Sequence, residues 1–136
     1  MLQFKENQAK EFENVVPQTH QSVEILSDRV LGQVVSYSDQ WFADATNLLK
    51  PTAPVRDATR FTHAGAWYDG WETRRHNTEE YDWVIFKAGV HAARIIGCEV
   101  DTAFFNGNHA PAISVQALRH EDAASAPSDI SEKDVR

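Results

Sequence analysis

The sequence has little cysteine and no long apolar run. Cys98 is the one cysteine in 136 residues, so no disulfide can form within the chain, which favours a reducing compartment. The first residues, MLQFKENQAKEF, alternate charged and apolar side chains and lack the apolar core of a signal peptide. No stretch has the length of a membrane-spanning helix. These absences predict a cytoplasmic protein with no membrane association.

Basic residues are also scarce. Lysine and arginine number 13 against 20 acids, for a net charge of −7 and a pI of about 5.3. A nucleic-acid-binding surface needs a basic face, so the sequence predicts no nucleic-acid partner. The arginines nevertheless gather in the middle of the chain, where a local anion site can form: Arg56, Arg60, Arg74, Arg75 and Arg94.

What is present is mostly β-type patterning. Residues 32–38 and 81–89 are rich in β-branched and aromatic side chains, and residues 93–105 and 112–118 alternate apolar and polar positions. The predicted strand at residues 81–89 is apolar on both faces, as a central strand covered on both sides would be. Ile113 and Val115 are expected to face inward, whereas residues 47–61, with two prolines, predict a long loop. The fold class predicted is all-β, a β-sandwich with few strands and therefore incomplete.

Composition also suggests boundaries. Residues 1–22 are predicted to be an N-terminal arm, residues 23–118 the folded unit, and residues 119–136, which lack aromatics and periodicity, a polar disordered tail that includes a solvated His120.

The stretch DGWETRRHN, residues 69–77, concentrates charge and hydrogen-bonding groups beside a turn. Trp67 and Trp71 are expected to plug the core, with Gly70 supplying a positive φ. On a strand, Arg74 and Arg75 would point to opposite faces. One would then bind a carboxylate through its fork while the other pairs with Asp82 or Glu99. The alternative is two solvated surface arginines.

The sequence context of the other acids, the histidines and the cysteine is less indicative of a functional site. Asp69, Glu72 and Asp101 lie near turns, where acids either do acid–base chemistry or cap the backbone. Six histidines show no metal-binding spacing, although His63, His76 and His109 with an acid remain conceivable as ligands. Cys98 is expected to be a buried, inert thiol.

Residues 32–89 and the stretch 95–118, which contains DTAFFNGNHAP, closely resemble the first repeat of the fungal allantoicase (allantoate amidinohydrolase) family. The resemblance implies a jelly-roll β-sandwich of the discoidin or galactose-binding type, shortened here because the family has two repeats. It implies hydrolysis of allantoate to ureidoglycolate and urea, in the use of purines as a nitrogen source, by a homo-oligomer. It names no cofactor and leaves a divalent metal open.

Allantoate carries one carboxylate and two ureido groups, and its chemistry assigns roles by residue type. The expected acid–base groups are Glu72, His76, Asp101 and His109. The expected substrate-binding groups are Asp69, Arg74, Arg75, Asn77 and Asn106. The alternatives to an enzyme are a non-catalytic jelly-roll binding module and an inactive remnant.

Overall fold

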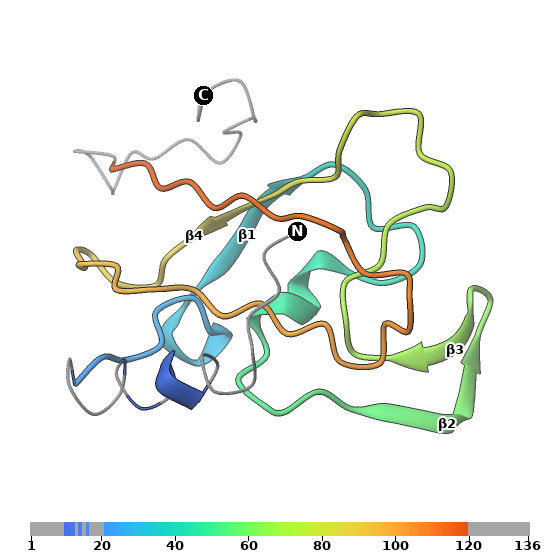
Figure 1. Ribbon diagram of the computed structural model, residues 1–136, viewed down its shortest axis with the longest axis horizontal. Helices are drawn as coiled ribbons and strands as arrows, with labels where there is room; N and C mark the ends of the chain where they lie inside the picture. Colours follow the sequence, from blue (N-terminus) through green and yellow to red (C-terminus); the bar gives the residue numbers. More distant parts are fainter. Residues whose placement is uncertain (1–9, 13, 15, 17–20, 120–136) are drawn as a thin grey trace.

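The computed structural model describes residues 10–12, 14, 16 and 21–119. Most of the predicted arm and tail, His120 included, lies outside the described residues, so the boundaries after 22 and 118 stay predictions. The regular structure of residues 21–119 consists of strands and short 3-10 turns, which confirms the all-β class (Figure 1). Among the described residues, no helix has the length and apolarity needed to cross a membrane.

The first sheet pairs β1 (Gln33–Tyr37) with β4 (Val84–Lys87) in antiparallel fashion. Both strands were predicted from their β-branched and aromatic content. The register shifts at Val35, between Val34 and Ser36, and the pairing continues past β1 as the Ser38 amide donates to the Trp83 carbonyl oxygen at 2.8 Å. Within the described chain β4 pairs with β1 alone, so its predicted place as a central strand is wrong.

The second sheet is a hairpin of β2 (Arg56–Thr62) and β3 (Gly65–Tyr68), and β2 falls within residues 47–61, where the sequence predicted a loop. That prediction is wrong because β2 buries almost nothing and so carries no apolar period. Its turn holds it instead: Gly65 has φ +116°, which few other residues adopt, and the Thr62 hydroxyl accepts from the Ala64 amide at 3.1 Å. Figure 1 shows the hairpin projecting at one end of the molecule.

Two further strands were predicted over 93–105 and 112–118, and neither forms a ladder. Their apolar side chains are exposed, including Ile113 at 55% and Val115 at 65%, so the expectation that these two face inward is wrong. Cys98, expected to be buried, is exposed as well. Alternation marks a strand only when a second strand and a covering layer meet it, and the described residues supply neither.

Between the sheets lies a short turn, η3 (Ala45–Leu49), which packs against β1. Ala45 and Leu49 are the buried apolar residues of the described chain, and both belong to η3. A preceding turn, η2 (Asp28–Val30), is capped by the Ser27 hydroxyl, which accepts from the Arg29 amide. Two small sheets over so small a core form an incomplete sandwich, as predicted.

Candidate functional site

The turn that follows β3 is fixed by two tight contacts. Asp69 clamps the entry to β2, because its Oδ1 accepts from the Val55 amide at 2.7 Å and its amide donates to the Val55 carbonyl oxygen. At Gly70 an added Cβ would lie 2.8 Å from the Phe105 ring. The predicted reason for Gly70, a positive φ, is wrong, since only Gly65 and Gly107 among the described glycines have one. Gly70 is instead required by the close approach of Phe105.

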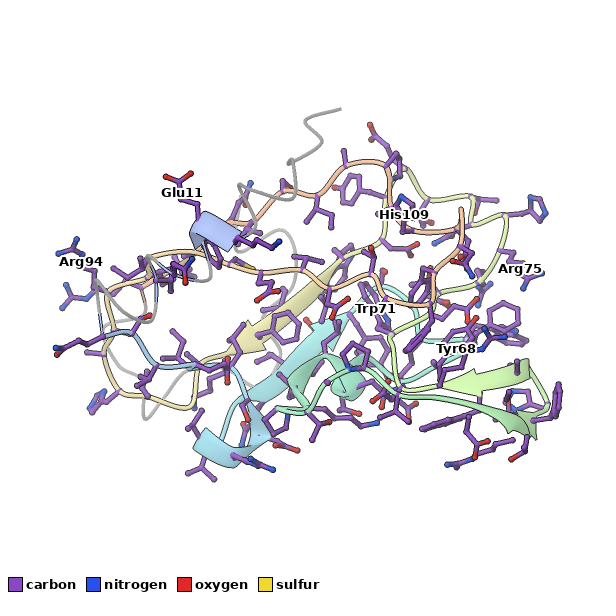
Figure 2. All side chains as sticks on the ribbon, turned by 60° about the horizontal axis from the view of Figure 1, so that its bottom comes forward. Glu11, Tyr68, Trp71, Arg75, Arg94 and His109 are labelled. Atoms are coloured by element: carbon purple, nitrogen blue, oxygen red, sulfur yellow. The ribbon has the colours of Figure 1, made fainter. Side chains whose placement is uncertain are left out.

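Phe105 thereby joins the two stretches that the sequence singled out. Its ring and the Tyr68 ring pack in a T-shaped arrangement with their centres 5.6 Å apart, and its carbonyl oxygen lies 3.2 Å from Nδ1 of His109. Figure 2 shows Tyr68, Trp71, Arg75 and His109 at the same end of the molecule. Residues 69–77 and 101–109 are therefore brought together by packing.

The His109 contact also fixes a tautomer. A carbonyl oxygen only accepts hydrogen bonds, so Nδ1 of His109 carries the proton and Nε2 keeps its lone pair in the neutral ring. Asp101 caps its own turn, with Oδ1 accepting from the Ala103 amide at 2.7 Å. Asn106 follows Phe105 directly and is exposed.

Glu72 is held by its backbone. It forms an isolated antiparallel bridge with Ala43, with amide–carbonyl distances of 3.1 and 3.2 Å. Burial and then the nearby Glu72 charge raise the pKa of Tyr68, so the phenol stays protonated at neutral pH. Both side chains line a cavity of about 20 Å³, enough for at most one water.

Arg74 pairs with Asp39, not with Asp82 or Glu99 as predicted. Its Nε donates to Oδ2 of Asp39 at 3.2 Å, its amide donates to Oδ1 at 2.6 Å, and its guanidinium lies 5.3 Å from the centre of the Trp41 ring. Burial works against the charge on Asp39. The Trp41 amide, the Arg74 amide and the Arg74 guanidinium outweigh it and lower the pKa of this carboxyl.

Arg75 and His76 lie in a turn, so the predicted strand that would send Arg74 and Arg75 to opposite faces is wrong. The guanidinium of Arg75 lies 5.4 Å from the centre of the Phe42 ring. His76 is exposed and has φ +56°, a left-handed conformation that is uncommon outside glycine. Trp71 is half-buried and donates its indole N–H to the Asp39 carbonyl oxygen at 2.8 Å. Trp67 is half-buried as well, so the prediction that these two tryptophans fill the core is wrong: the buried apolar residues of the described chain are Ala45 and Leu49.

Asp82 organises the loop that follows. Its carboxylate accepts from the hydroxyls of Ser38 and Thr73 and from the Asn77 amide nitrogen, at 2.8 to 3.0 Å. Asn77 also accepts from the Glu79 amide at 3.2 Å. The side chain of Asn77 is therefore engaged in holding this loop, and a ligand would have to share it.

An open groove of about 480 Å³ was missed by sequence reasoning. Its lining comes from the end of β1, the segment after it and the turn of the β2–β3 hairpin: Tyr37, Ser38, Asp39, Gln40, Trp41 and His63. Asp39 and Trp41, an acid close to an aromatic residue, were the feature of the sequence that could have indicated it. Nothing in the sequence shows that His63 contributes to the same lining. No three His, Cys, Asp or Glu side chains gather as metal ligands anywhere in the described part of the chain.

Comparison with known proteins gives the family. The family described as "Allantoicase repeat" matches residues 23–135. The chain is 62% identical over 111 residues to the allantoicase of Saccharomyces cerevisiae, an alignment covering 82% of this chain and 32% of that protein. The chain belongs to the allantoicase family. Its likeness to the Neurospora crassa allantoicase is 56% over 95 residues, covering 70% of this chain and 27% of the relative.

Solved allantoicase structures have the same fold. One superposes with a TM-score of 0.80 at 48% identity, over 99% of this chain and 39% of that chain. The crystal structure from Saccharomyces cerevisiae gives a TM-score of 0.69 at 49% identity, over 93% and 37%. These likenesses confirm the β-sandwich fold and the predicted family. The chain spans about a third of the length of the curated allantoicases that it matches.

Proposed function

We propose that this protein hydrolyses allantoate to ureidoglycolate and urea, in the use of purines as a nitrogen source. The observation that carries the proposal is the packing of Phe105 on Tyr68 and against Gly70. That contact brings two groups of acid–base residues to one end of an allantoicase-family chain. Hydrolysis of allantoate needs such groups on both the water and the leaving nitrogen.

In the proposed site, the substrate carboxylate binds an arginine fork from Arg74 or Arg75. The N–H groups of the ureido arms donate to carboxylate and amide oxygens of Asp69, Asn77 and Asn106. Asp69 retains Oδ2 for this purpose, since Oδ1 is taken by the Val55 amide. No step of the proposal needs a cofactor, and the requirement for a divalent metal is left to the assay.

The reaction forms one C–O bond and breaks one C–N bond at the central carbon of allantoate. Glu72 is the proposed base that takes a proton from the attacking water, because its backbone is fixed by the bridge to Ala43 and its side chain lines a cavity of about one water's size. His109 is the proposed acid that protonates the departing urea nitrogen through Nε2, because its Nδ1 is engaged by the Phe105 carbonyl oxygen. His76 and Asp101 are the remaining candidates for these two roles.

Urea release from allantoate tests this proposal. The chain is assayed with chelator and again with added divalent metal, and the Saccharomyces cerevisiae allantoicase is assayed in parallel. Glu72→Gln, in the chain and at the matching position of the relative, is expected to lower kcat by about 100-fold or more, as loss of a general base does. Unchanged turnover in both proteins would remove Glu72 from the mechanism. A chain that binds allantoate without releasing urea would instead be a binding module.

We also propose that the protein acts in the cytoplasm as a homo-oligomer. The free, exposed Cys98 is compatible with a reducing compartment, and the exposed apolar side chains of residues 113–118 are compatible with a subunit contact. Fractionation and light scattering of the native protein are the corresponding measurements.

A further inference from the structure

The 480 Å³ groove and the small cavity beside Glu72 differ in what they can hold. The groove has room for a molecule the size of allantoate, whereas a cavity of about 20 Å³ holds at most one water. Arg74 is bonded to one wall of the groove, Asp39, and stacked on another, Trp41. Arg75 stacks on Phe42, which lines the small cavity instead. The two adjacent arginines therefore contact the linings of different cavities: Arg74 that of the groove and Arg75 that of the small cavity.

Arg74 is also the better prepared of the two to receive an anion. Asp39 accepts from its Nε, and its Cζ lies 5.3 Å from the centre of the Trp41 ring, so both contacts limit the movement of the side chain and leave the two Nη nitrogens for a carboxylate. The side chain is 53% exposed, so a ligand can reach this fork. Fixing a long side chain in advance removes part of the entropy loss that binding otherwise requires.

The rest of the groove suits a planar, amide-like body. Trp41 is 60% exposed, which leaves aromatic surface for stacking. Gln40 accepts from the Ala45 amide through Oε1, so its NH₂ group remains to donate to a carbonyl. His63, from the hairpin turn, adds an imidazole to the lining, which can donate or accept.

We propose that this groove is the carboxylate subsite for a small ureido acid, with the Nη pair of Arg74 receiving the carboxylate and Trp41 packing against the ureido plane. The identity of the full ligand rests on the proposed function, whereas the subsite is tested by binding alone. It selects Arg74 over Arg75 and adds Trp41, Gln40 and His63 to the residues that determine specificity.

The test compares two probes, N-carbamoylglycine and its neutral carboxamide, by calorimetry or by NMR titration of the intact chain. The chain is expected to bind the acid more tightly than the amide. Arg74→Gln is expected to weaken binding of the acid by about 10- to 100-fold, the effect of losing hydrogen bonds to a charged group, and to leave the amide unchanged. Arg74→Lys is expected to fall between them, because it keeps the charge and loses the fork.

Arg60→Gln is the matched control. Arg60 is also an arginine stacked on a tryptophan, 4.4 Å from the centre of the Trp67 ring, and its loss changes the net charge equally. Binding of the acid to this variant should match that of the unmodified chain. Trp41→Leu keeps every charge and should weaken binding of both probes. Thermal unfolding of each variant verifies that it is folded.

Equal binding of acid and amide, no binding of either probe, or sensitivity to Arg75→Gln in place of Arg74→Gln would each overturn the subsite. The proposed function fails in a different way. A chain and a relative that release no urea, yet bind the acid through Arg74, would refute the hydrolysis and retain the subsite. Urea release by a chain whose affinity for the acid is unchanged by Arg74→Gln would support the hydrolysis and refute the subsite.

Discussion

Two residues outside the predicted site, Tyr68 and Asp39, lie beside charged groups within it. Tyr68 lies close enough to Glu72 for that charge to raise its pKa, and Asp39 accepts from the amide and Nε of Arg74. Asp39 lies 35 positions before Arg74, so this contact is not local in sequence. The acid–base side chains and the arginines could be found by residue type in residues 69–77. Their partners could not, because composition says nothing about which distant segment packs beside them.

The Tyr68 phenol is expected to ionise above its ordinary pKa of 10.0, because burial and the Glu72 charge disfavour the phenolate. Glu72→Gln should lower the pKa of Tyr68 by removing that charge. Absorbance at an alkaline-tyrosinate wavelength, taken as the difference between the unmodified chain and Tyr68→Phe, isolates this one phenol. Because the folded pKa lies above the unfolded one, the stability that this group contributes is full below the unfolded pKa and is lost as pH rises through the folded value. A Tyr68 that titrates identically with and without Glu72 would contradict the contact.

Asp39→Asn is expected to destabilise the chain by about 1–2 kcal/mol at neutral pH, because it weakens the hydrogen bonds to Arg74. The pKa of Asp39 is lowered in the folded state, so its contribution is present above the ordinary value of 3.8 and is lost as pH falls through the folded pKa. Urea unfolding of both proteins over this acid range measures the difference. It should shrink towards low pH.

Asp57→Asn serves as the control for that experiment. The Thr59 hydroxyl and then its amide lower the pKa of Asp57, but both partners lie two residues away on the same exposed strand. Its loss should leave the stability of the chain nearly unchanged. If the two substitutions lowered stability equally, the long-range contact between Asp39 and Arg74 would contribute no more stability than a local turn does.

Among the elements, the contact between the turn after β3 and the 101–109 segment is the one on which the site depends. Gly70→Ala puts a Cβ 2.8 Å from Cε2 and 3.1 Å from Cζ of Phe105, so the ring must move. The expected loss of stability is about 1–3 kcal/mol, typical of overpacking. The proposed urea release should fall with it, because His109 bonds to the Phe105 carbonyl oxygen and moves with that residue.

Adding Phe105→Leu to Gly70→Ala tests the cause. The shorter side chain leaves room for the added methyl group, so the double variant should recover stability relative to the sum of the single losses. The measurement is a double-mutant cycle: the free energy of unfolding of the unmodified chain, the two single variants and the double variant. Strict additivity would show that the methyl group introduced at position 70 clashes with something other than Phe105.

The strands differ in how far the sequence could foretell them. β1 and β4 carry β-branched and aromatic residues that pair with each other, and both were predicted. β2 exposes nearly all of its side chains and is held by its turn, so no periodicity marks it. Residues 93–105 and 112–118 show the converse. Their alternation of apolar and polar residues is clear. Such alternation indicates that one face is suited to burial, but it does not show whether another layer is present to bury it.

At the scale of the whole molecule, the described chain leaves a row of apolar side chains uncovered. Ile95, Val100, Ile113, Val115 and Leu118 are each about half exposed or more. The allantoicases that match the chain are about two and a half times as long, so relatives have further chain with which to cover the equivalent positions. Exposed apolar side chains lose contact with water when two copies associate, which favours association.

The isolated chain is therefore expected to self-associate through residues 113–118. Ile113→Lys with Val115→Lys should reduce the association, because lysines on an uncovered strand-like segment block pairing with a second copy. Val23→Lys is the matched control, since Val23 is 77% exposed but lies outside that segment. Light scattering across a dilution series measures the mass of each protein. The double variant should be smaller than the unmodified chain and the control at every concentration. A monomeric unmodified chain, or a control that dissociates equally, would show that this segment does not mediate the contact.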